Sequence, residues 1–234
     1  RAKKINIYNQ MAQVLVGHDA TGAIREFDED GDLTGGTKMR EVFFINVARL
    51  LTKDEIKKGS FSLQLGVNSA HDEAHTGHKI KLADTGAATD YRVNSPAGEY
   101  GILYATNVEG ANLTTDDGTQ KAGLIFYQAG VIVVTGSVFH NASDESAGIL
   151  SSATHANDCI MLANESPAVK FSDDVGTVGI LQDRAISANC DAIRHRIVDM
   201  SFNNTTELNS TIYFCRANHN EFNYSSNPTY TSSS

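Results

Sequence analysis

The stretch GLIFYQAGVIVVTGSVF (residues 123–139) constrains the fold of this chain more than any other part. It is dense in Ile, Val and Phe, which favour strands. Gln128, Ala129 and Gly130 interrupt it, as at a tight turn or bulge between two strands. The stretch GEYGILYATN (residues 98–107) has the same character. We expect both stretches to form central strands of a sheet.

Period-two alternation marks further strands. In SFSLQLGV (residues 60–67), Phe61, Leu63 and Leu65 alternate with polar residues, which predicts a half-buried strand. HKIKLAD continues the pattern, and the sequence between the two would connect antiparallel neighbours. The other expected strands are EVFFINVARLL (residues 41–51, buried on much of both faces), CDAIRHRIVDM (residues 190–200), residues 212–214 and residues 222–224.

Helical features are few. We expect one helix from about Asn9 to Val16, ended by Gly17, because glycine favours the left-handed conformation that follows a helix. TKDEIKKG predicts a brief helical turn, with Thr52 and Glu55 at capping-box spacing and Gly59 as its stop. The sequence therefore predicts a mainly β chain: an antiparallel β-sandwich-like domain with one or two short helices and long polar loops.

The length of 234 residues suits one large β domain or two smaller domains, and we expect a single mainly β domain in which residues 66–90 and 140–185 are variable surface loops. The formal net charge of −9 argues against a nucleic-acid backbone as partner. No apolar run approaches the length of a membrane span. Cys159, Cys190 and Cys215 form no C-x-x-C pair, and a Cys190–Cys215 disulfide stays open because sequence alone does not give its geometry.

Three histidines gather in HDEAHTGH (residues 71–78): His71, His75 and His78. A zinc protease places glutamate directly after the first histidine, whereas this chain has Asp72 there and Glu73 one position late. No apolar stripe flanks the motif to anchor a helix. We interpret it as a solvated loop between strands and treat the three histidines as weak metal candidates only.

The segment ATGAIREFDEDGDLTGG (residues 20–36) predicts a hairpin whose turn is rich in Asp and Gly. Asp28, Asp30 and Asp32 invite comparison with a calcium loop. In an EF-hand the glycine is sixth and a glutamate is twelfth, whereas Gly31 is fourth here and the glutamate is missing. A charged turn is the simpler interpretation.

The chain contains neither a G-x-S-x-G elbow nor a dinucleotide-binding fingerprint. His195 stands between two arginines on an expected strand, without a carboxylate partner nearby in sequence. It fits a surface or hydrogen-bonded residue better than a general base. We therefore expect no enzyme activity and no cofactor.

Four stretches together resemble segments of one protein family: KDEIKKGSFSLQLGV, NSPAGEYGILYATN, GLIFYQAGVIVVTGSVF and the long block CDAIRHRIVDMSFNNTTELNSTIYFCRANHNEFNYSSNPTY. They resemble large virion structural proteins of contractile-tailed bacteriophages, particularly those of marine cyanobacteria. Members are longer and continue past NPTY into further β structure, so the chain is expected to be a segment of a longer subunit. The final block is the most specific part of the resemblance.

The resemblance implies a structural subunit of the phage tail, in the baseplate or neck. Its partners would be copies of itself and other virion structural proteins, and it would be made in the bacterial cytoplasm and reside in the virion. A receptor- or glycan-binding module of a tail appendage, which would contact a host-surface receptor, and a capsid decoration protein are the alternatives. The resemblance implies no catalytic residues.

Assembly would use apolar residues near the two chain ends. EFNYSSNPTYTSSS offers Phe222, Tyr224 and Tyr230 as anchors for a neighbour's pockets, while Pro228 limits regular sheet pairing. The other interpretation is that these aromatics cap the subunit's own core. KINIYNQM leaves the same choice for Ile5, Ile7 and Tyr8.

Overall fold

The computed structural model describes residues 2–66, 79–107, 121–138, 185–206, 210–214 and 216. Its helices are α1 (Ala2–Leu15), α2 (Arg49–Thr52) and α4 (Ile186–Arg196), with a 3-10 turn, η1, at Gly136–Val138. Its strands are β1 (Phe27–Asp28), β2 (Lys38–Met39), β3 (Val42–Asn46), β4 (Glu55–Ile56), β5 (Ser62–Gly66), β6 (Lys79–Ala83), β7 (Tyr91–Arg92), β8 (Tyr100–Asn107), β9 (Lys121–Phe126), β10 (Val131–Thr135), β11 (Ile197–Ser201) and β12 (Asn204–Thr205).

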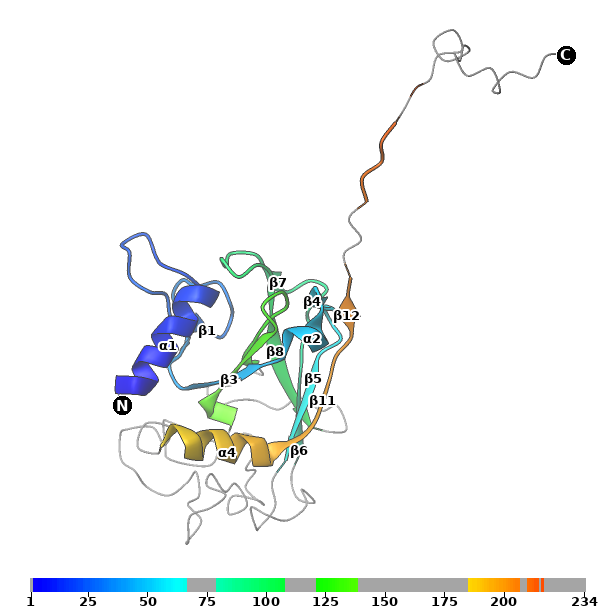
Figure 1. Ribbon diagram of the computed structural model, residues 1–234. Helices are drawn as coiled ribbons and strands as arrows, with labels where there is room; N and C mark the ends of the chain where they lie inside the picture. Colours follow the sequence, from blue (N-terminus) through cyan, green and yellow to red (C-terminus); the bar gives the residue numbers. More distant parts are fainter. Residues whose placement is uncertain are drawn as a thin grey trace, which may run out of the picture.

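One eight-stranded sheet dominates this part of the chain. Its order is β11-β5-β6-β8-β9-β10-β3, and the short β7 also pairs with β8. Every pairing in it is antiparallel. The sheet is strongly curled (Figure 1), and the pairs β1–β2 and β12–β4 lie outside it. The mainly β, antiparallel fold class expected from the sequence is confirmed.

The centre of the sheet is the hairpin that the stretch 123–139 predicts. β9 and β10 pair with Phe126 opposite Val131, and residues 127–130 form the turn between them. Gly130 has a φ of 65°, a conformation that glycine adopts without steric penalty. All five residues of β10 are buried, as its continuous apolar sequence requires. The predicted strands at residues 60–67 and 98–107 are β5 and β8, and β6 pairs antiparallel with β5 as expected.

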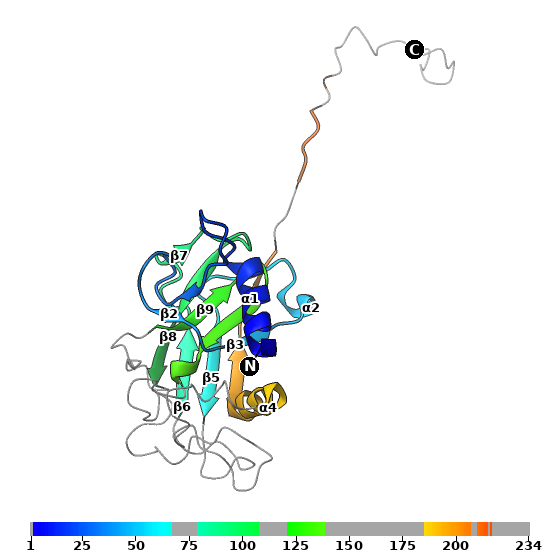
Figure 2. The same ribbon diagram turned by 90° about the vertical axis from the view of Figure 1, so that its left-hand side faces the viewer.

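Two apolar cores lie on the two faces of the sheet. One contains Leu63, Leu82, Leu103, Ile125, Ile132 and, from α4, Ile193. The other contains Leu124, Phe126 and Val133 of the sheet together with Ala12, Leu15 and Phe27. The second core therefore fixes α1 and the β1–β2 hairpin against the sheet (Figure 2). This arrangement gives the sandwich-like layering.

The N-terminal helix is longer than its apolar spacing predicts. α1 begins at Ala2 rather than near Asn9, and it ends at Leu15. Gly17 follows with a φ of 76°, and its N–H donates to the carbonyl of Ala12. The predicted glycine stop is confirmed. The predicted hairpin after it is also present, because Phe27 pairs with Met39 and Asp28 with Lys38.

Two predictions in residues 41–59 are wrong. β3 lies at the edge of the sheet and only Phe43 is buried in it, so it is not buried on both faces. Glu55 is no helix-capping residue, because β4 begins there and pairs with β12. That pairing joins segments about 150 positions apart, and a local capping pattern does not reveal it.

Two predictions in the final third are also wrong. The first seven residues of the stretch 190–200 belong to α4, and only Ile197 onward forms a strand, β11. Residues 212–214 form no strand and are exposed. Residues 79–83 of the predicted loop 66–90 form β6. Residues 67–78 of that loop, residues 140–184, which include Cys159, and residues 222–224 lie outside the described residues.

Candidate functional site

A groove opens at the β3 edge of the sheet, between α1 and α4, and we call it the edge groove. Its volume is about 640 Å³, within the size range of ligand pockets. α1 lies on one side of β3 and α4 on the other (Figure 2). Its apolar lining includes Ile5, Ile7, Tyr8, Val42, Phe44 and Ile193. Glu26 and Arg40, also in the lining, form an exposed ion pair at 3.2 Å.

The backbone of β3 is directed partly into this groove. The N–H of Val47 donates to Gly130 and the carbonyl of Glu41 accepts from Gly136, so the odd-numbered residues of this segment face β10. Along an antiparallel strand, the backbone N–H and C=O groups of successive residues point to opposite sides of the strand. The N–H and C=O groups of Val42, Phe44 and Asn46 consequently point away from β10. Within the described residues, β3 pairs with β10 alone.

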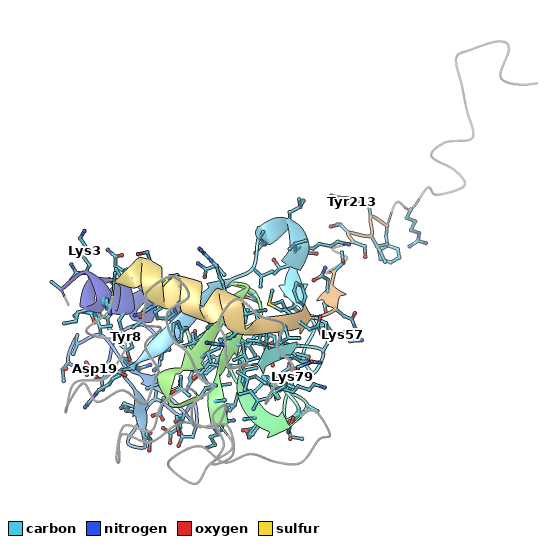
Figure 3. The ribbon with its side chains drawn as sticks, turned by 90° about the horizontal axis from the view of Figure 1, so that it is seen from below. Lys3, Tyr8, Asp19, Lys57, Lys79 and Tyr213 are labelled. Atoms are coloured by element: carbon cyan, nitrogen blue, oxygen red, sulfur yellow. The ribbon has the colours of Figure 1, made fainter. Side chains whose placement is uncertain are left out.

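A second apolar feature lies outside the domain body, and we call residues 210–214 the apolar segment. Ile212, Tyr213 and Phe214 are 72%, 85% and 93% exposed. Figure 3 shows Tyr213 on a segment that leads away from the sheet and helices. The segment follows β12, whose partner β4 lies beside α2, on the far side of the domain from α1 (Figure 1).

Asp28, Asp30 and Asp32 form an acidic cluster, with carboxylate oxygens within 4.8 Å of one another. Burial raises the pKa of Asp28, and the ion pair with Lys38 partly offsets this effect. For Asp30, burial acts in the same direction, but the Asp32 N–H and the Asp28 side chain outweigh it, so its pKa is lowered. Hard cations such as Ca²⁺ bind oxygen donors of this kind. The ammonium of Lys38 already provides positive charge here, which fits the charged turn expected from the sequence.

The acidic turn is fixed from the neighbouring strands. Arg92 donates to the carbonyl of Asp30 at 3.1 Å. The buried Tyr100 hydroxyl donates to the carbonyl of Gly31 at 2.7 Å, and the amide of Asn94 reaches the same carbonyl at 3.2 Å. Burial raises the pKa of Tyr100 to about 12, so this donor stays protonated at neutral pH. These hydrogen bonds hold the backbone of the acidic turn against the neighbouring strands.

The structure places three of the predicted interface residues together. Ile5 and Ile7 are 49% and 40% exposed on α1, and both line the edge groove with Tyr8. Tyr8 is also anchored in the subunit's own core, because its ring packs edge-on against Phe27 at 5.4 Å. The other predicted interface residues, Phe222, Tyr224 and Tyr230, and the metal candidates His71, His75 and His78 lie outside the described residues.

His195 belongs to α4 and not to a strand. Cys190, on the same helix, carries a free thiol and lines the edge groove. Because Cys190 is free, the Cys190–Cys215 disulfide that the sequence left open is not formed in this structure.

The sequence interpretation missed the edge groove because it missed α4. Ile186, Cys190, Ile193 and Ile197 recur at intervals of four, three and four residues, which is helical spacing. Three of these four residues line the groove. The open edge of β3 has no comparable marker, because it depends on which strands become neighbours.

No helix in the described part of the chain has the length and apolar character needed to cross a membrane. Comparison with protein-family models, with curated proteins and with solved structures finds no match to this chain.

Proposed function

We propose that this chain is a structural subunit of a bacteriophage virion, which assembles with copies of itself and with other virion proteins in the tail, at the baseplate or neck. Its activity is assembly and not catalysis. The chain would act by placing apolar surface and strand edges against neighbouring subunits.

The apolar segment is the observation that carries this proposal. Three adjacent large apolar side chains project into solvent, and burial of each would stabilise a complex by about 1.5–3 kcal/mol. α2 adds Leu50 and Leu51, which are 88% and 57% exposed. Contiguous exposed apolar groups typically mark interaction sites.

The virion setting rests on the resemblance of the four sequence stretches. The apolar segment lies inside the most specific of them, residues 190–230. An exposed apolar segment beside a curled antiparallel sheet suits a subunit that contacts neighbours. The tail position and the alternative of capsid decoration depend on the resemblance alone.

Two measurements test the proposal together. Mass photometry of the purified chain across a concentration series should show oligomers that form reversibly. Mass spectrometry of purified virions from the source phage should detect its peptides in fixed proportion to other tail proteins. A chain that stays monomeric at every concentration and is missing from the particles would refute the proposed function.

A receptor- or glycan-binding module is the second candidate, because Tyr213 and Phe214 are exposed aromatics of the type that stack on sugars. A glycan array separates it from assembly. Tyr213→Ser should abolish glycan binding under this alternative while leaving the oligomers intact. Under the assembly proposal, the array should show no selective binding.

A further inference from the structure

We propose that the edge groove accepts residues 211–214 of a second copy of this chain as an added strand beside β3. This inference rests on the proposed assembly function and specifies its contact. The partner is another copy, and each copy contributes one segment and one groove.

The first argument is the chemistry of the groove. Val42, Phe44 and Asn46 direct backbone donors and acceptors away from β10, and an extended peptide laid beside them forms the next antiparallel or parallel ladder. Side chains of that peptide alternate between two faces. Ile212 and Phe214 would then face one wall, and Tyr213 the other.

The two walls suit such a peptide because each carries apolar side chains. α1 supplies Ile5 and Ile7 on one side, and α4 supplies Ile193 on the other. Residues 211–214, TIYF in the sequence, are β-branched and aromatic, and such residues favour strands. Addition of this strand would remove from water both the segment and the partly exposed groove lining.

The second argument is the position of the segment in this structure. Figure 3 shows Tyr213 on a segment that leads away from the sheet and helices, and Ile212, Tyr213 and Phe214 are exposed, so the segment does not occupy the groove of its own chain. Segment and groove are therefore both open in each copy, and a second copy can supply the added strand. β12 itself lies near the end of β3, because Asn204 donates to the carbonyl of Leu51 in α2 at 2.6 Å. A segment that folded back into its own groove would give a monomer, and this outcome would overturn the proposal.

The contact is head-to-tail, because the segment and the groove are different surfaces. Interfaces of this kind close into rings or continue as filaments. A copy that lacks a working segment can still receive one, and a copy that lacks a working groove can still donate one. This asymmetry makes the proposal testable by complementation.

The test uses full-length chains. The segment variant is Ile212→Ser with Phe214→Ser, and the groove variant is Ile5→Glu, which places a charge on the exposed wall of α1. Val14→Glu is the matched control: it lies on the same helix and is 67% exposed, and it is not part of the groove lining. Asn46→Pro is a second groove variant, because it removes an outward N–H and leaves the β10 ladder intact. Circular dichroism verifies that each variant is folded.

We expect the segment variant and the groove variant each to be monomeric, and their equimolar mixture to form dimers and nothing larger. Val14→Glu should assemble like the unaltered chain. A labelled peptide of residues 208–216 with Cys215→Ser should bind the segment variant. Adding Ile5→Glu or Asn46→Pro to that variant should weaken peptide binding about tenfold or more.

The outcomes separate this inference from the proposed function. If the unaltered chain forms oligomers that persist in both groove variants, the groove assignment is overturned and assembly stands. If the two variants are monomeric but their mixture forms no dimers, the pairing of segment with groove is overturned. A chain that is monomeric without any substitution overturns the inference, whereas the assembly proposal is refuted only if its peptides are also missing from virions.

Discussion

The hydroxyl of Tyr127 donates a hydrogen bond to Oδ2 of Asp84 across 3.1 Å, inside the core. The same carboxylate accepts the N–H of Gly59 at 2.6 Å and that of Phe61 at 3.0 Å. One buried side chain thereby joins the turn between β9 and β10, the approach to β5 and the end of β6. Burial, followed by the nearby Asp84 carboxylate, raises the pKa of Tyr127.

Asp84→Ala should lower the free energy of unfolding by about 3 kcal/mol, because it leaves three buried or partly buried donors without their acceptor. Urea denaturation at neutral pH measures this loss. Asp199→Ala is the control, since Asp199 is exposed on β11 and its removal should change stability by about 0.5 kcal/mol or less. Equal effects of the two substitutions would contradict a special role of Asp84.

Tyr8 connects α1 to the β1–β2 hairpin. Its hydroxyl donates to the carbonyl of Met39 at 2.9 Å and accepts the N–H of Phe27 at 3.1 Å. Tyr8→Phe keeps the ring packing and should cost about 1–2 kcal/mol at neutral pH. Because the substitution removes only the hydroxyl, the measured loss of stability reports its two hydrogen bonds.

The same residue predicts a pH dependence. Burial raises the pKa of Tyr8 to about 12 from an unfolded value of 10, so the folded state retains the proton more tightly. Its contribution is complete below pH 10 and is lost as the pH rises toward 12. Stability curves of the unaltered chain and Tyr8→Phe should therefore converge over this interval. Parallel curves would show that Tyr8 does not titrate as its burial requires.

Lys38 neutralises the buried carboxylate of Asp28. Lys38→Met should lower the free energy of unfolding at pH 7 by about 2–4 kcal/mol, because one charge of a largely buried pair is left alone. Burial raises the pKa of Asp28, so the folded state binds a proton more readily than the unfolded chain. The loss should therefore shrink as the pH falls toward 5. Denaturation at the two pH values measures it, and a loss that grows on acidification would contradict this account.

Gly123 lies in β9 where that strand meets β10. A Cβ atom there would lie 2.0 Å from the carbonyl oxygen of Val133, which is backbone and cannot move without breaking the ladder. Gly123→Ala should therefore abolish soluble expression or lower the melting temperature sharply. At Gly22 a Cβ atom meets nothing within 4 Å, although the φ of 86° adds backbone strain. Gly22→Ala should cost about 1 kcal/mol, so the comparison isolates the steric clash.

The sequence reveals the strands whose neighbours are close along the chain. β9, its turn and β10 follow directly from two apolar runs and a short interruption, and β5 follows from simple alternation. Pairings such as β4 with β12 depend on distant segments and leave no local pattern. The sequence also marks Ile5 and Ile7 as surface candidates, whereas the groove between them and Ile193 exists only once α4 and β3 are placed.

α4 bridges the opening of the curled sheet. Its 11 residues span about 16 Å, beginning beside β3 and continuing directly into β11 at the opposite end of the strand order. The apolar segment follows β11 and β12 along the same stretch of chain. A pull on that segment would therefore reach β12 and its pairing with β4 first, then β11 and its ladder with β5, and then the helix that forms one wall of the groove. In a row of joined copies, mechanical load would pass from each contact between segment and groove to the next along one continuous path.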